Sequence, residues 1–149
     1  MEQQELQNDV AIMKVIVDEA AAFWNKDYTE WARHWVHSPY IRFMGWWPAG
    51  GVTVVEGWSM LSVMMQEVMA ANPAPNPTAT NVRRENINLQ VRGDVAWVTF
   101  DQYGEDTGDT RMDMAGLSRE TRFLEKQAGE WKIAYVCWLL AGPSGDAVS

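Results

Sequence analysis

The sequence has few of the residues that build metal and redox sites. Its 149 residues include one cysteine, Cys137, and two histidines. A single cysteine forms neither an intramolecular disulfide nor a cysteine-rich zinc site, and the sequence contains no P-loop or GxGxxG motif. We therefore expect no metal and no cofactor, and a reducing, cytoplasmic setting.

Positive charge and long apolar runs are also scarce. Twelve Lys plus Arg stand against 20 Asp plus Glu, which gives a net charge of −8 without a visible basic cluster. Binding to nucleic-acid phosphates needs clustered cations. No stretch approaches the roughly 20 apolar residues of a membrane-spanning helix, and the acidic N-terminus is the reverse of a secretory signal. We expect neither nucleic acid nor membrane as a partner.

Tryptophan and methionine, in contrast, are abundant. The chain has nine of each but only four phenylalanines. Its length suits a single domain over residues 1–149, with a core at about residues 8–140, and such a domain needs no disulfide or metal to be stable. Aromatic side chains at this density are buried, line a cavity or form an interface.

The periodicity of apolar residues predicts three helices and six strands. Apolar residues recur every three to four positions from Leu6 to Trp24, which indicates an amphipathic helix. Asp27 is suited to cap a second helix that Ser38-Pro39 ends, and Trp58 to Ala71 forms a third. Strands are predicted at residues 40–46, 53–55, 81–92, 95–103, 117–126 and 131–140. This order favours an α+β fold with the helices on one face of the sheet.

Alternation along the last three strands places apolar residues on both faces of the sheet. We therefore expect the helices to cover one face and a second copy of the chain to cover the other. Trp131 is assigned to this outer face. The other residues predicted there are Ala96, Val98, Phe100, Phe123, Ile133 and Tyr135.

The segment from Ser118 to Ile133 carries Glu-Thr-Arg followed by Gly-x-Trp, and Ala96 to Tyr103 matches the strand before it. With the two helices, the strand and the Met-rich helix that precede them, these segments resemble the nuclear transport factor 2 (NTF2)-like fold, in particular its SnoaL-like branch. The hairpin is also similar to the association domain of calcium/calmodulin-dependent kinase II. The resemblance implies a cone-shaped barrel of three helices packed on a strongly curved, mostly antiparallel sheet.

The resemblance also implies a set of site residues. The arginine of Glu-Thr-Arg, Arg122, points into the cone. Two further cavity arginines of the association domain correspond to Thr99 and Trp138, which leaves Arg122 as the single cation. A buried arginine needs a carboxylate or a ligand anion, and Asp101 and Glu120 are the expected partners. The other expected wall residues are Trp97, Thr99, Tyr103 and Trp138 from strands, and Trp24 and Met65 from helices.

These features predict a homodimeric protein that binds a small apolar or aromatic molecule, with the polar or anionic end of that molecule near Arg122. One alternative is a cofactor-independent isomerase, dehydratase or cyclase that uses Asp101 or Glu120 as base and Tyr103 as hydrogen-bond donor. Ketosteroid isomerase is an enzyme of the same superfamily. By resemblance, its aspartate base corresponds to Phe43 or Met44 of this chain, and its tyrosine on the first helix corresponds to Glu19. A second alternative is a hub-like assembly module.

Two other groups of residues are candidate metal sites: His34 and His37 with Glu30, and an acidic stretch in the second half of the chain. Trp31 and Trp35 share the apolar face of their helix, which predicts that His34 lies at the surface. The acidic stretch from Asp101 to Asp113 lacks the spacing of an EF-hand loop. We interpret this stretch as a solvated connection between two strands.

Overall fold

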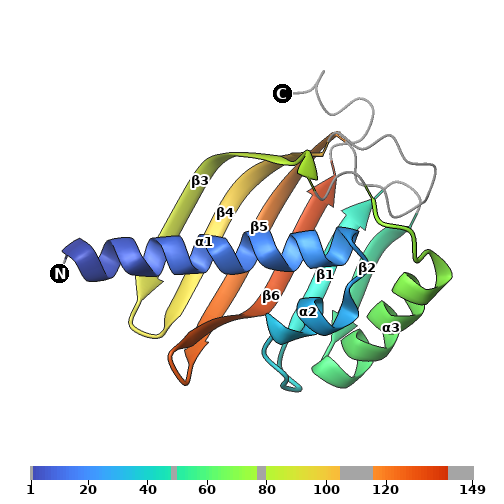
Figure 1. Cartoon of the computed structure of the whole chain (residues 1–149), viewed down its shortest axis with the longest axis horizontal. Coiled ribbons are helices and arrows are strands. Elements are labelled where there is room, and N and C mark those ends of the chain that lie inside the picture. Colours follow the sequence, from blue (N-terminus) through green and yellow to red (C-terminus); the bar gives the residue numbers. More distant parts are fainter. Residues whose placement is uncertain (1, 48–49, 77–79, 105–115, 141–149) are drawn as a thin grey trace.

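The computed structural model describes residues 2–47, 50–76, 80–104 and 116–140 (Figure 1). The helices in this part of the chain are α1 (Glu2–Trp24), α2 (Tyr28–Arg33) and α3 (Trp58–Ala71). The strands are β1 (Arg42–Trp47), β2 (Gly51–Glu56), β3 (Arg83–Arg92), β4 (Val95–Gly104), β5 (Gly116–Gln127) and β6 (Glu130–Leu140). Each predicted helix and strand is therefore present, with shifted ends.

The strands form one curved, open sheet of six strands in the order β2-β1-β6-β5-β4-β3. Neighbouring strands are antiparallel except β1 and β6, which run parallel. The long helix α1 lies across one face of the sheet, and α2 and α3 lie near the C-terminal end of α1 (Figure 1). The predicted α+β architecture, with helices on a mostly antiparallel sheet, is confirmed.

An apolar stripe holds α1 against the rest of the protein. Such a stripe stabilises a helix mainly through tertiary packing. After α1 ends, Asp27 caps α2 as predicted, because its Oδ1 accepts a hydrogen bond from the backbone N–H of Glu30 at 3.2 Å. The buried stripe of α1 contains Ile12, Ile16, Ala20 and Phe23.

The two faces of β4 are the reverse of the prediction. Val98 lies opposite Arg122, and Phe100 lies opposite Glu120. Directly opposite residues of neighbouring strands share a face, so Val98 and Phe100 lie on the helix-covered face, where both are buried together with Ala96. The assignment of these three residues to the outer face is wrong. Alternation alone separates the two faces but does not say which one the helices cover.

A shift in register also changes which residues in the first half of β6 face the helices. Tyr135 lies opposite Phe123 on the outer face, but the next pair joins Leu124 to Ile133, with a register shift between them. Ile133 and Trp131 therefore turn into the core and are buried. Their predicted position on the outer face is wrong, because strict alternation does not detect a β-bulge.

The metal-site candidates take other roles. His34 is buried rather than exposed as predicted, and its Nε2 lies 3.0 Å from Oε1 of Glu30. Within the described ranges, no cluster of His, Cys, Asp and Glu could hold a metal ion, and no helix is long and apolar enough to cross a bilayer. Most of the acidic stretch, residues 105–113, lies outside the described residues.

Candidate functional site

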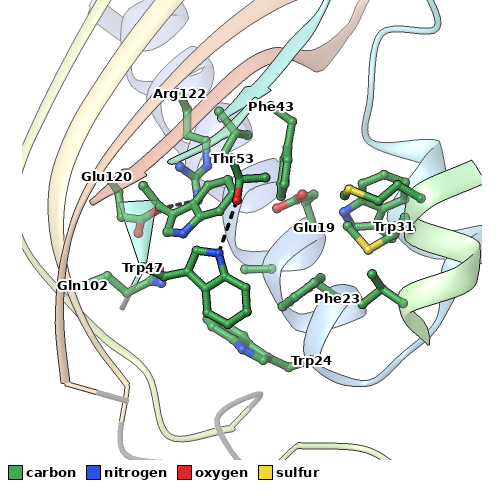
Figure 2. Close-up of a pocket in the computed structure, with 16 residues that line it drawn as sticks. Glu19, Phe23, Trp24, Trp31, Phe43, Trp47, Thr53, Gln102, Glu120 and Arg122 are labelled. Carbon is green, nitrogen blue, oxygen red and sulfur yellow. Dashed lines mark hydrogen bonds and ion pairs between the residues drawn. The ribbon is translucent and has the colours of Figure 1, made fainter. Parts of the chain in front are cut away.

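A cavity of about 180 Å³ lies between the helices and the sheet (Figure 2). Its walls come from α1, α2, α3 and from all strands except β3. The apolar lining residues are Ala20, Phe23, Trp24, Trp31, Phe43, Trp47, Met64, Met65, Val68, Val136 and Trp138. The polar lining residues are Glu19, Thr53, Gln102, Glu120 and Arg122. The arrangement is that of an aromatic and methionine-walled site with a few polar groups, as is typical of small-molecule sites.

The polar centre of the cavity is a buried ion pair on β5. Nη2 of Arg122 lies 2.7 Å from Oε1 of Glu120, and the two side chains are 7% and 1% exposed. Ser118 donates a hydrogen bond from its Oγ to Oε2 of Glu120 at 2.6 Å. Nη1 of Arg122 donates to the backbone oxygen of Thr121 at 3.1 Å. These contacts hold the guanidinium and the carboxylate in place, and Figure 2 shows the ion pair between Arg122 and Glu120.

Glu19 brings a second carboxyl group into the cavity, from α1 (Figure 2). Its Oε2 accepts a hydrogen bond from Nε1 of Trp35 at 3.0 Å. Burial raises the pKa of Glu19 above its ordinary value, while the charge of Arg122 and the Trp35 hydrogen bond act in the opposite direction. A carboxyl group with a raised pKa can donate or accept a proton nearer to neutral pH.

A second arginine, Arg84 of β3, lies on the same face of the sheet. It lies directly opposite Gln102 of β4, and Gln102 lines the cavity. The Cζ atoms of Arg84 and Arg122 lie 5.9 Å and 5.4 Å from the ring centroid of Phe100. Burial, and then the positive charge of Arg122, lower the pKa of Arg84. Arg84 is therefore a second cation on this face, whereas Arg122 is the one cation among the described residues that line the cavity.

The structure places the predicted site residues in two groups. One group lines the cavity and consists of Arg122, Glu120, Trp138, Trp24 and Met65. The other group lies on the opposite, outer face of β4 and consists of Trp97, Thr99, Asp101 and Tyr103. This second group cannot contact a molecule inside the cavity, because the sheet lies between them.

The predicted pairing of Asp101 with Arg122 is wrong. Oδ2 of Asp101 lies 2.8 Å from Nη1 of Arg119 and accepts a hydrogen bond from Asn86 at 2.7 Å. Asn86, and then Arg119, hold the pKa of Asp101 below its ordinary value. Tyr103 lies under the guanidinium of Arg83, 4.4 Å from its Cζ to the ring centroid. Neither residue is available as a catalytic group in the cavity.

Among the charged and amide side chains on the cavity side, three were not predicted as site residues: Glu19, Gln102 and Arg84. Two of them carry a signal in the sequence. Glu19 interrupts the apolar stripe of α1, and Gln102 continues the alternation of Val98 and Phe100. Arg84 carries none, because a register shift between Glu85 and Asn88 breaks the alternation of β3.

Comparison with known proteins places this cavity in a family. A family model described as a SnoaL-like domain matches residues 12–137. The chain belongs to the SnoaL-like domain family. This SnoaL-like match includes Glu19, Arg84, Glu120 and Arg122, so the whole polar part of the cavity lies within the family domain. No curated protein matches the chain.

Solved structures confirm that this SnoaL-like chain has the NTF2-like fold. An NTF2-like protein of unknown function from Shewanella oneidensis has a TM-score of 0.64 and 13% identity, over 89% of this chain and 98% of that chain. A candidate ketosteroid isomerase from Parabacteroides distasonis has a TM-score of 0.61 and 16% identity, over 90% of this chain and 89% of that chain. A candidate calcium/calmodulin-dependent protein kinase type II association domain from Thiobacillus denitrificans has a TM-score of 0.62 and 12% identity, over 85% of this chain and 91% of that chain. At these identities the likeness shows the fold alone.

Proposed function

We propose that the protein binds a small apolar or aromatic molecule in the cavity, with the polar end of that molecule near the Arg122–Glu120 pair. The observation that carries this proposal is the lining, which combines aromatic and methionine walls with one buried ion pair. Methionine side chains such as Met64 and Met65 adapt to irregular shapes. Apolar burial at about 25 cal/mol per Å² supplies the affinity, and the polar centre sets the orientation.

The size of the cavity limits the ligand to about one ring. An apolar protein cavity of about 150 Å³ accepts benzene, and this cavity measures about 180 Å³. Trp24 and Trp138 line the cavity, and within the described residues neither indole N–H has a hydrogen-bond partner. A ring with one carbonyl or amide substituent matches both the volume and these donors.

Benzamide titrated by calorimetry tests the proposal with two matched variants of α3. Val68 lines the cavity, whereas Val63 of the same helix is 56% exposed. We expect Val68→Trp to fill the cavity and to weaken binding by at least about tenfold, and Val63→Trp to bind as the wild type does. If the wild type binds no one-ring aromatic, or if Val68→Trp binds it equally well, the proposed site is wrong.

A second candidate function is acid–base catalysis, favoured by the position of Glu19 in the cavity and by its raised pKa. In this account the ionised Glu19 removes a proton from the carbon next to a substrate carbonyl and returns it. Asp101 and Tyr103 lie on the outer face, and Glu120 is held by Arg122. NMR of one-ring ketones in D₂O tests the idea: we expect enzyme-dependent deuterium exchange with the wild type and none with Glu19→Gln. Equal exchange in both proteins would exclude Glu19 as the base.

The outer face of the sheet supports the expected homodimer. Its exposed large apolar residues are Val52 and Val54 of β2, Trp46 of β1, Leu139 of β6 and Phe123 of β5. They lie on neighbouring strands and together make an apolar surface that no helix in the described part of the chain covers. Burial of this surface against a second copy removes it from water.

A further inference from the structure

Arg84 carries two buried hydrogen-bond donors that have no partner. Among the described residues, nothing accepts a hydrogen bond from its Nε or its Nη2. These two atoms form one edge of the planar guanidinium, and the parallel N–H bonds of that edge match the two oxygens of a carboxylate. A buried, charged donor without an acceptor destabilises the folded protein. A bound ligand with suitable acceptor oxygens would give both donors of Arg84 a hydrogen-bond partner.

The residues next to Arg84 continue this polar region into the cavity. Gln102 is 3% exposed and has a buried Oε1 without a partner, and Arg122 is 6% exposed and has a buried Nε without a partner. Gln102 lies opposite Arg84 and lines the cavity. Both guanidiniums also lie near the ring of Phe100. Gln102 and Arg122 thus bring unsatisfied polar atoms to the wall of the cavity, and Arg84 lies behind this wall, next to Gln102.

The charges at this end favour an anion with a single negative charge. Glu120 lies 2.7 Å from Arg122 and neutralises it. Within the described part of the chain, no carboxylate lies at ion-pair distance from Arg84. A phosphate with two charges would leave one of them uncompensated near Glu120 and Glu19, at a Coulomb cost that is large in a buried site. A carboxylate brings one charge and two coplanar acceptors.

We propose that the cavity binds a small aromatic monocarboxylate of about the size of benzoate, with its carboxylate extending past the lining residue Gln102 to the Nε–Nη2 edge of Arg84. The side-chain amide of Gln102, which can donate as well as accept, contacts the same carboxylate. The ring lies among the aromatic and methionine side chains of the cavity. This inference rests on the proposed binding function, and adds the charge of the ligand and the residue that anchors it.

Calorimetric titration of benzoate and its neutral analogue benzamide separates two claims: that the cavity binds a one-ring aromatic molecule, and that Arg84 binds the carboxylate of this molecule. The variants are Arg84→Gln and, as a matched control, Arg83→Gln. Arg83 precedes Arg84 in the chain, but its side chain is 54% exposed and pairs with Glu85. Both variants remove one positive charge from β3. Charge-assisted hydrogen bonds contribute enough to predict that wild-type protein binds benzoate at least about tenfold more tightly than benzamide.

We expect Arg84→Gln to abolish this preference and Arg83→Gln to retain it. Arg84→Lys keeps the charge but lacks the two-donor edge, so it should lose most of the preference. Thermal unfolding shows whether each variant is folded. Equal binding of the two ligands by the wild type, or an unchanged preference in Arg84→Gln, overturns the carboxylate site while the cavity proposal stands. If neither ligand binds the wild type, both proposals fail.

Discussion

Glu19 makes the stability of the protein depend on pH. Burial raises its pKa in the folded protein, so the unfolded chain gives up this proton at a lower pH than the folded protein does. The stability that belongs to the neutral carboxyl group is fully present below the unfolded pKa of about 4.5. It is lost as the pH rises through the raised value of the folded state.

Glu19→Gln tests this dependence, because glutamine keeps a side-chain oxygen for Trp35 and does not ionise. We expect the variant to match the wild type near pH 4 and to be more stable near pH 8, by about 1.4 kcal/mol for each unit by which the pKa is raised. Thermal unfolding across this range measures the difference. Glu56→Gln, at an exposed position, is the matched control for replacing a carboxylate by an amide. A Glu19→Gln difference that is independent of pH would contradict burial as the main cause.

The ion pair of Glu120 and Arg122 predicts a large cost for removing one partner. Glu120→Gln leaves Arg122 as a buried charge without a counter-ion, which typically costs about 3–5 kcal/mol. Glu56 also pairs with an arginine, Arg42, at 2.6 Å, but it is 62% exposed. Its substitution should cost less than about 1 kcal/mol. Urea unfolding compares the two variants, and equal free energies of unfolding would show that burial of the pair has no effect.

Single residues also show how far sequence reasoning reaches. Arg122 was predicted from the Glu-Thr-Arg pattern, and the structure places it inside the cavity beside Glu120. Asp101 was predicted beside them because it is a nearby carboxylate on a neighbouring strand. Its side chain lies on the other face, since position along a strand fixes the face and chemical type does not.

At the level of elements, the parallel pairing of β1 and β6 shapes the cavity. Gly45 of β1 lies opposite Trp138 of β6, and a Cβ atom at Gly45 would overlap the ring and the backbone oxygen of Trp138. Gly45→Ala should therefore displace Trp138, which lines the cavity, and destabilise the protein by about 1–3 kcal/mol. Urea unfolding measures the cost, and Val63→Ala on the exposed side of α3 is the control. A Gly45→Ala protein as stable as the control would show that Trp138 moves freely.

The helices and strands were largely predictable because their signals are local. The apolar period of α1, the Asp27 cap and the β-rich runs all depend on neighbouring residues. The faces of β4 and β6 depend on the register between strands, and a bulge near Phe123 changes that register. Register is a property of paired strands, so a single sequence contains little direct information about it.

At the level of the whole molecule, the exposed apolar face predicts a dimer. Light scattering at micromolar concentration should give twice the chain mass of 16.9 kDa. Leu139→Lys introduces a charge into this face and should give the mass of a single chain. Val63→Lys, on the exposed side of α3, should remain dimeric. A wild-type monomer would contradict the proposed interface, and a ring of more than two copies would favour an assembly module.

The central claim is that the cavity between the helices and the sheet is the ligand site. A crystal structure with 4-bromobenzoate tests it most directly, because the anomalous signal of bromine locates the ring. We predict a bromine peak inside the cavity, among Trp24, Met65 and Trp138, with the carboxylate directed toward Arg84. Bromine peaks confined to the outer face or the surface, with an unoccupied cavity, would contradict the claim.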